Sequence, residues 1–228
     1  MAQPQILAIG GGGDTDEQTR ALLTHALSLT GKERPRVLQV PTAQADSAEA
    51  IVRTHERLGG LCELSHVRFF PWPPADLRER ALSQDAIVVD GGNAANMLAI
   101  WRVHGFDAIL REAWESGVVL FGVSAGMICW FEAYVTDSFG PQLEGMQNGL
   151  GFLSGSACPH FDGEPKRRPR FRELVDGGFP EGVAADDGVG FHFVATELRE
   201  VVTCRPGAAA YRIMRGGEER LDARELSG

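Results

Sequence analysis

The sequence predicts an α/β fold in which a mostly parallel β-sheet is covered by helices on both faces and bordered by antiparallel strands. The main observation is that short apolar runs alternate with helical patterns from residue 6 to residue 130. This alternation is typical of parallel sheets whose strands are buried on both sides. A second observation is that glycine-rich turns follow several of these runs. Because α/β proteins place their sites at such strand ends, the polar groups of these turns are the candidates for function.

The bulk composition fits a single domain, residues 1–228. The chain has 228 residues and is 43% hydrophobic, which is enough to bury a substantial core. Its formal net charge of −9 argues against a nucleic-acid partner and against an anionic membrane surface. No apolar run is long enough to span a bilayer, and the N-terminus lacks the basic and apolar regions of a signal peptide. We therefore expect a cytoplasmic protein.

The cysteines and histidines predict no metal, no cofactor and no disulfide framework. The four cysteines are widely spaced and form no C-x-x-C pair, a pattern that does not indicate a disulfide scaffold in a chain of this length. No H-E-x-x-H or comparable metal-binding pattern occurs. The chemistry is therefore expected to come from side chains alone.

The elements of the first half follow in order. A strand at residues 6–9 leads into four glycines at 10–13, and Asp14 or Thr15 would then cap a helix over residues 16–29. The glycines could instead hold the phosphates of a nucleotide, but the Lys-Ser/Thr of a P-loop is missing. Apolar runs and helical periodicity next predict strands at 36–40, 62–70 and 85–89, and helices at 47–58, 76–82, 106–116 and through 97–101.

The stretch from Val118 to Trp130 is the centre of the predicted site. It begins as an apolar strand, turns at Gly122-Val-Ser-Ala-Gly126 and continues as an apolar run that we expect to be a buried helix up to Trp130. Strand, glycine-flanked turn and helix form the nucleophile elbow, G-x-S-x-G. Ser124 would then be a nucleophile, and the N–H of Ala125 would donate to an oxyanion. The alternative is a turn of small residues without chemistry.

The second half is richer in turns. Residues 131–151 are mixed, residues 151–153 form a short strand, and a polar loop spans 158–169. A helix is expected at 170–175 and strands at 182–185 and 190–194. Residues 201–204 and 209–214 would form a closing antiparallel pair, and the polar tail, 216–228, would fray.

A serine nucleophile needs a base, and His160 is the candidate among the six histidines. The other five fall in or beside predicted helices and strands, whereas His160 lies in a polar loop, where functional residues concentrate. The carboxylate that orients this imidazole is expected among Asp137, Asp162, Asp186 and Asp187. The resulting order of Ser, His and acid differs from the Ser, acid, His order of α/β-hydrolases.

Taken together, these segments resemble a known family. In order and spacing they are similar to motifs of the serine peptidases of the peptidase E (aspartyl dipeptidase) and cyanophycinase family: Asp90-Gly91-Gly92-Asn93, Gly122-Val-Ser-Ala-Gly126, Cys158-Pro-His-Phe161, Arg167-Arg168-Pro169 and Ala185-Asp-Asp-Gly188. The resemblance covers about residues 6–214. It implies a flavodoxin-like fold similar to class I glutamine amidotransferases, with Ser124 as nucleophile and His160 as base. It also implies oxyanion-hole N–H groups at Gly92 and Ala125 and substrate contact by Asn93.

The chain departs from that family at two places. The family usually has a glutamate where Asp187 stands, so the contact with His160 would be looser, and Asp186 or Asp137 could serve instead. The aspartyl dipeptidases hold the substrate's carboxylate with an arginine, for which Arg167 is the nearest match and Arg168 its neighbour. A guanidinium suits bidentate carboxylate binding, but a solvated loop arginine or an ion pair at a helix start is the alternative.

The sequence thus predicts a serine peptidase that hydrolyses short peptides, Asp-X dipeptides among them, through Ser124, His160 and Asp187. We expect a monomer or a homodimer. The alternatives are an esterase or a cyanophycinase-type isopeptidase on the same scaffold, a catalytically idle homologue that binds small molecules or peptides, and a flavodoxin-like nucleotide binder that uses residues 10–13.

Overall fold

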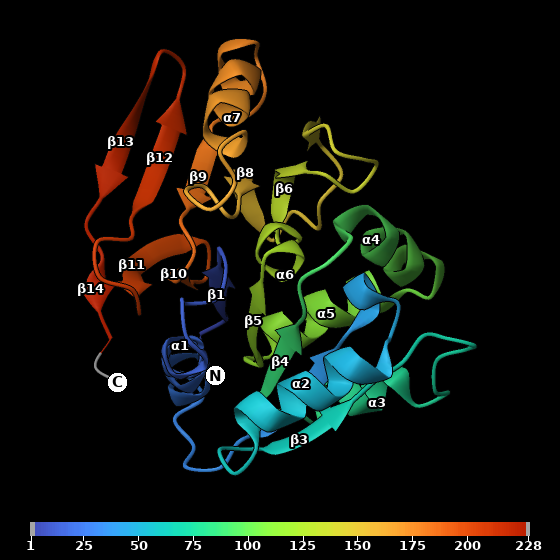
Figure 1. Ribbon diagram of the computed structural model, residues 1–228. Helices are drawn as coiled ribbons and strands as arrows, with labels where there is room; N and C mark the ends of the chain where they lie inside the picture. Colours follow the sequence, from blue (N-terminus) through green and yellow to red (C-terminus); the bar gives the residue numbers. More distant parts are fainter. Residues whose placement is uncertain (1–2, 227–228) are drawn as a thin grey trace.

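The computed structural model describes residues 3–226, which form two β-sheets (Figure 1). The larger sheet has the strand order β14-β11-β10-β1-β5-β4-β2-β3. The five strands from β1 to β3 are parallel to one another, and β10 and β11 continue the sheet beside β1 as antiparallel strands. Their bounds are β1 Gln5–Ile9, β2 Arg36–Val40, β3 Glu63–His66, β4 Ala86–Val89, β5 Val119–Val123, β10 Val189–Val194, β11 Glu197–Thr203 and β14 Arg224–Glu225. The predicted fold class, α/β with a mostly parallel sheet and antiparallel edge strands, is confirmed.

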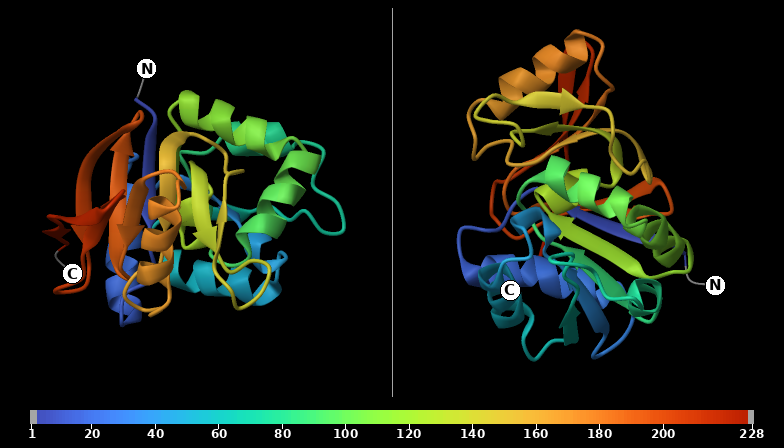
Figure 2. Two further views of the ribbon diagram at one scale, coloured as in Figure 1. Left: turned by 90° about the horizontal axis from the view of Figure 1, so that it is seen from above. Right: turned by 90° about the vertical axis from the view of Figure 1, so that its right-hand side faces the viewer.

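Helices cover both faces of the larger sheet (Figure 2). Alternate side chains of each central strand enter two different core clusters: in β1, Ile6 and Ala8 join one cluster, and Leu7 and Ile9 join the other. Apolar side chains of α1 and α2 complete the second cluster, and those of α3, α4 and α5 complete the first. This is why the strands read as continuous apolar runs. The helices are α1 Asp16–Ser28, α2 Ala48–Leu58, α3 Leu77–Leu82, α4 Ala94–Val103 and α5 Phe106–Glu115, with a short 3₁₀ turn at Thr42–Gln44.

The smaller sheet lies above the carboxyl ends of the parallel strands (Figure 1) and was not predicted as a separate layer. Its strand order is β13-β12-β9-β8-β6-β7, and α7 (Arg167–Asp176) packs against it. The strands are β6 Phe131–Thr136, β7 Glu144–Met146, β8 Leu153–Cys158, β9 Gly182–Ala185, β12 Ala210–Met214 and β13 Gly217–Leu221.

Two predictions about the last third of the chain are wrong. Residues 201–204 and 209–214 do not pair with each other, because β11 pairs with β10 in the larger sheet while β12 pairs with β9 and β13 in the smaller one. The tail does not fray as predicted, because residues 217–221 and 224–225 form edge strands. Edge strands with one solvated side need few apolar residues, so their polar sequence hid them. The last two residues of the tail prediction, and the first two of the predicted domain, lie outside the described residues.

The predicted helix up to Trp130 is also wrong. Helix α6 (Ala125–Ile128) has a single turn, and β6 begins at Phe131. A buried apolar run has no periodicity that separates a helix from a strand, so the change of structure within it could not be read. Residues 131–151, expected to be mixed and rich in turns, contain the strands β6 and β7. The remaining differences are shifts of boundaries: the third strand is residues 63–66, the short strand near 151 begins at Leu153, and the helix expected at 170 begins at Arg167.

The short helix α6 lies where the two sheets meet (Figure 1). It contacts β1, β4 and β5 of the larger sheet and β6 and β8 of the smaller one. The largest core cluster likewise contains residues from both sheets, for example Val89, Tyr134 and Ala185. That the whole chain is one domain remains a prediction. None of the helices in residues 3–226 is long and apolar enough to cross a membrane.

Candidate active site

Ser124 lies in a sharp turn between β5 and α6. Its backbone has φ 57 and ψ −108, a conformation that costs a non-glycine residue energy and that concentrates at functional sites. The flanking glycines allow this turn. A Cβ at Gly126 would lie 2.2 Å from the Val89 carbonyl oxygen, and a Cβ at Gly122 would lie 2.5 Å from the carbonyl oxygen of Gly126. The spacing G-x-S-x-G therefore follows from close backbone packing beneath the serine.

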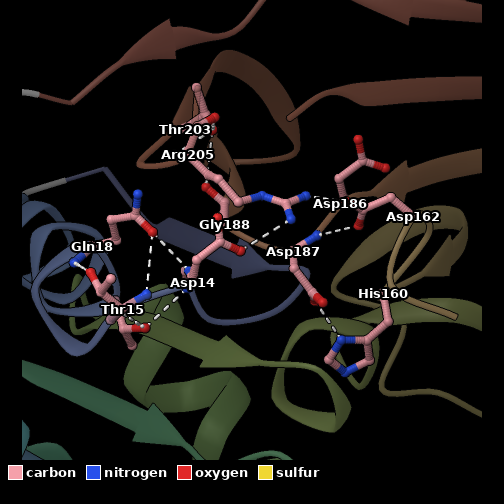
Figure 3. A network of polar contacts seen from close by, with 12 residues as sticks. Asp14, Thr15, Gln18, His160, Asp162, Asp186, Asp187, Gly188, Thr203 and Arg205 are labelled. Atoms are coloured by element: carbon pink, nitrogen blue, oxygen red, sulfur yellow. Dashed lines mark hydrogen bonds and ion pairs between the residues drawn. The ribbon is translucent and has the colours of Figure 1, made fainter. Parts of the chain in front are cut away.

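His160 lies in the loop between β8 and α7 and faces Ser124. Its Nε2 is 2.9 Å from the Ser124 Oγ, and its Nδ1 is 2.5 Å from Asp187 Oδ1, the contact drawn in Figure 3. With the proton on Nδ1, the imidazole donates to the carboxylate and accepts the serine hydroxyl. The backbone of His160 also has positive φ, 51°. The structure thus brings together the three residues of the predicted catalytic group, from segments far apart in the sequence.

Asp187 reaches His160 because two glycines leave room for its carboxylate. A Cβ at Gly11 would lie 1.7 Å from Asp187 Oδ1, and a Cβ at Gly163 would lie 2.5 Å from Oδ2. The turn between β9 and β10 can therefore come close enough for the shorter aspartate, and the looser contact that the sequence led us to expect is not present. Among the glycines at 10–13, Gly11 thus provides space for this carboxylate. Thr15 caps α1, as predicted.

The other candidate acids have different partners. Asp186 Oδ2 accepts a hydrogen bond from the Ala209 N–H at 2.8 Å. Asp162 accepts the N–H of Asp187 itself at 2.9 Å. Asp137 lies 3.7 Å from Arg167. Each is near the group but none contacts the His160 imidazole, which leaves Asp187 as the carboxylate in place to orient it.

The two residues predicted to supply oxyanion donors, Gly92 and Ala125, lie on different segments. Ala125 is the first residue of α6, where a backbone N–H has no partner within its helix. Gly92 has φ +136, and a Cβ there would lie 2.3 Å from the Ala43 carbonyl oxygen, so this position requires glycine. Within residues 3–226, neither N–H donates to a protein acceptor. Gly92 lies on the loop after β4 and lines the same cavity as Ser124. Ala125 directly follows Ser124 in the chain.

A cavity of about 350 Å³ opens over Ser124 and His160. Asn93 lines it, although its side chain already caps α4 and donates to the Ser138 carbonyl oxygen at 2.8 Å. Arg167 lines it too. Arg168 does not: it pairs with Glu218 and lies over the Tyr211 ring, 4.7 Å from the ring centroid. The cavity therefore presents one of the two predicted arginines.

Sequence reasoning missed Glu164 and Ser138, which also line this cavity. Glu164 holds Arg167 through two hydrogen bonds, of 2.7 Å to Nε and 3.2 Å to Nη2. The ion pair at a helix start was considered as the alternative role of Arg167, and the spacing of three residues was its signal. The structure shows that Arg167 both forms this ion pair and faces the cavity.

Neither Cys158 nor Cys129 offers a rival nucleophile. Cys158, two residues before His160, is fully buried, and burial raises the pKa of its thiol to about 12. Burial likewise holds the pKa of Cys129 far above its usual range. Within residues 3–226 there is no group of three or more His, Cys, Asp or Glu side chains arranged to hold a metal ion.

Asp90, the first residue of the Asp-Gly-Gly-Asn motif, is buried directly after β4, at the start of the loop that contains Gly92. Gln39 Nε2 donates to its Oδ2 at 2.7 Å and Thr54 donates to its Oδ1 at 3.3 Å. Burial raises the pKa of this carboxyl to about 6 and outweighs both hydrogen bonds, which act to lower it.

We expect Asp90→Asn to remove part of the pH dependence of stability between about pH 4 and 6. The folded state binds the Asp90 proton up to about pH 6, whereas the usual carboxyl pKa is 3.8. The free energy of unfolding therefore falls as pH rises through this window, by up to about 3 kcal/mol. Urea unfolding across the window measures this change, and an unaltered slope in the variant would contradict it.

For Asp85, hydrogen bonds from Lys32 and Arg36 outweigh burial and lower the pKa of the carboxyl. The carboxylate therefore contributes stability that is lost as pH falls, and Asp85→Asn should remove that contribution.

Comparisons with known proteins agree with one another. The model of peptidase family S51 matches residues 6–201. The uncharacterised peptidase YgaJ of Bacillus subtilis (strain 168) is 45% identical over 218 residues, which cover 94% of each chain. A peptidase from an acI-B1 actinobacterium has a similar fold, with a TM-score of 0.68 and 18% identity over 97% of this chain and 95% of that one. A candidate peptidase E from Listeria monocytogenes EGD-e has a TM-score of 0.64 and 16% identity over 97% and 100%.

Proposed function

Because the chain belongs to peptidase family S51 and is a serine-type peptidase, we propose that it hydrolyses short peptides through a catalytic triad of Ser124, His160 and Asp187. The observation that carries this proposal is the continuous row of contacts, 2.9 Å from Ser124 Oγ to His160 Nε2 and 2.5 Å from His160 Nδ1 to Asp187 Oδ1. The first distance is that of an ordinary hydrogen bond, and the second is shorter than the usual range.

In the proposed mechanism, Ser124 Oγ attacks the carbonyl carbon of the scissile peptide bond while His160 Nε2 takes the hydroxyl proton. Asp187 keeps the imidazole in the required tautomer and stabilises the imidazolium. The tetrahedral intermediate then expels the amine, which receives the proton from His160, and an acyl-enzyme remains on Ser124. Water, activated by the same imidazole, hydrolyses this ester and restores the serine.

The negative charge of each tetrahedral intermediate would be held by the N–H groups of Gly92 and Ala125. These donors are backbone groups fixed by packing, so they need no reorganisation when the charge develops. One such donor lowers the barrier by about 3 kcal/mol.

The size of the cavity supports a short substrate. Its volume, about 350 Å³, is at the lower end of the range of ligand pockets. A free dipeptide or tripeptide is therefore proposed in preference to a folded protein. The aspartate at position 187 is the reason for the idle-homologue alternative, and its contact with His160 supports the catalytic role.

The direct test is hydrolysis of a panel of di- and tripeptides, an aryl ester and a β-aspartyl isopeptide by the wild-type chain, together with labelling by a fluorophosphonate. Cleavage of α-peptides with labelling of Ser124 is the expected result. Turnover of the ester or the isopeptide alone would replace the proposal with the corresponding alternative. Absence of both labelling and turnover would favour an idle binding protein.

We further propose that acidic side chains of the substrate compete with Glu164 for Arg167. The Arg167 side chain is 4% exposed and Glu164 occupies two of its N–H groups. A substrate carboxylate must therefore share or displace that partner, and the nearby Asp137 carboxylate adds to the repulsion.

Two variants with opposite effects test this competition. Glu164→Gln keeps the side-chain size and frees the guanidinium, so the ratio of kcat/KM for Asp-Leu over Ala-Leu should rise about tenfold, the factor that corresponds to 1.4 kcal/mol. Arg167→Gln should lower the same ratio. A ratio that moves in the same direction in both variants, or in neither, would remove Arg167 from recognition of the substrate.

A further inference from the structure

Three aspartates and one arginine gather behind the proposed triad (Figure 3). The aspartates are Asp162, two residues after His160, and the adjacent pair Asp186 and Asp187 in the turn that connects β9 with β10. Arg205 comes from the turn that follows β11. Neither Asp162 nor Arg205 lines the cavity above Ser124, so the peptidase mechanism as described leaves both without a role.

Asp162 joins the backbone of the acid to a fixed positive charge. Its Oδ1 accepts the N–H of Asp187 at 2.9 Å, and its Oδ2 is paired with Nη2 of Arg205. The other terminal nitrogen of Arg205 lies 3.3 Å from Asp14 at the start of the α1 region. The guanidinium is thus held between two carboxylates, and its side chain is only 20% exposed.

These contacts tie the His160 loop to the Asp187 turn in more than one place. The Phe161 N–H donates to the Ala185 carbonyl oxygen at 3.0 Å, and the side chain of Asp162 holds the N–H of Asp187. In addition, Nδ1 of His160 donates to the Asp187 carboxylate. The loop and the turn are therefore fixed to each other on both sides of the catalytic hydrogen bond.

The charges of the cluster are balanced by the same arginine. Burial acts to raise the pKa of Asp162, but the Asp187 N–H and Arg205 outweigh it and lower that pKa, so Asp162 is held as a carboxylate. For Asp186, burial raises the pKa, the Asp162 charge adds to the rise, and Arg205 opposes it. Without Arg205, the repulsion between the Asp162 and Asp186 carboxylates would be unopposed by that guanidinium.

We propose that Asp162 and Arg205 are positioning residues. They hold the backbone of Asp187 at the place from which its short side chain reaches His160. This proposal rests on the triad proposed above. It also explains how an aspartate can act at this place: the glycines at 11 and 163 leave space for the carboxylate, and the Asp162–Arg205 pair fixes the backbone from which it extends. A displacement of 1 Å in such a group can lower a rate by about 100-fold.

The test combines kinetics with a signal that does not depend on turnover. Asp162→Ala and Arg205→Met should each lower kcat by on the order of 10²-fold and leave KM within about twofold, because neither residue lines the cavity. The low-field proton resonance of a His160 Nδ1–H donated to Asp187 should weaken or disappear in both variants. Asp162→Asn keeps an oxygen that can accept the Asp187 N–H, so it should retain more activity than Asp162→Ala.

Asp14→Asn is the matched control, because it removes the other, solvent-facing partner of Arg205 and leaves Asp162 in place. Its kcat should stay within about twofold of the wild type, as expected for an exposed ion pair. Retention of the low-field resonance in folded Asp162→Ala and Arg205→Met would overturn the positioning role, whether or not kcat falls. If Asp162→Ala does not fold, Arg205→Met decides by the same criterion. A wild-type chain without peptidase activity would refute the proposed function alone, since the resonance still reports the position of Asp187.

Discussion

Replacing Ser124 with alanine is expected to lower kcat for peptide hydrolysis by on the order of 10⁶-fold with little change in KM. The hydroxyl at this position is the only group of the elbow that the mechanism uses covalently, and its Oγ faces His160 Nε2 at 2.9 Å. A methyl group cannot form the acyl-enzyme, so the residual rate would come from binding and from the oxyanion donors alone. Steady-state kinetics on the best dipeptide of the panel, with active-site titration, measures the loss.

Two further observations complete this experiment. The double variant Ser124→Ala/His160→Ala should be no slower than Ser124→Ala, because residues that act as one unit have strongly non-additive effects. The Ser124→Ala variant should unfold at nearly the wild-type temperature, since one hydroxyl in a half-open site is removed. Undiminished hydrolysis by this variant would exclude the serine mechanism.

Replacing Asp187 with asparagine should lower kcat by on the order of 10⁴-fold. The amide is nearly isosteric, so the fit between Gly11 and Gly163 is retained. However, its NH₂ group can donate to Nδ1 and favour the tautomer with the proton on Nε2, which cannot accept the proton of Ser124.

Asp186→Asn serves as the comparison for Asp187→Asn. Asp186 accepts the Ala209 N–H and makes no contact with His160, so its replacement should reduce stability more than turnover. If the fall in kcat were larger for Asp186→Asn than for Asp187→Asn, the acid of the triad would have to be reassigned.

Local patterns together with the family resemblance were sufficient to predict the centre of the site. The elbow around Ser124, the loop that contains His160 and the turn with Asp187 each follow an apolar strand, and the order and spacing of these segments resemble those of a family that joins them in one site. Their assembly could therefore be expected before any coordinates. The class of fold followed from the same alternation of strands and helices.

Other features depend on contacts between residues far apart in the chain. The role of Gly11 depends on Asp187, near the opposite end of the sequence, and no property of the glycine run indicates that partner. The smaller sheet could not be predicted for a similar reason: β6 continues the apolar run of the elbow, and β13 is polar because it lies at an edge. An ion pair of Arg167 at a helix start was one alternative, but its partner Glu164 was not predicted, and the position of Arg167 in the cavity depends on how α7 packs.

The two-sheet architecture divides the proposed triad between two structural layers. Ser124 follows a strand of the larger sheet, His160 follows a strand of the smaller sheet, and Asp187 lies in the turn that connects them. The distance from Ser124 Oγ to His160 Nε2 therefore depends on how the two sheets are placed relative to each other. The contact of His160 with Asp187 does not, because the His160 loop and the Asp187 turn are bonded to each other. Local opening of the smaller sheet, which costs less than global unfolding, would separate the nucleophile from its base. On heating, catalytic activity should accordingly disappear before the parallel sheet melts.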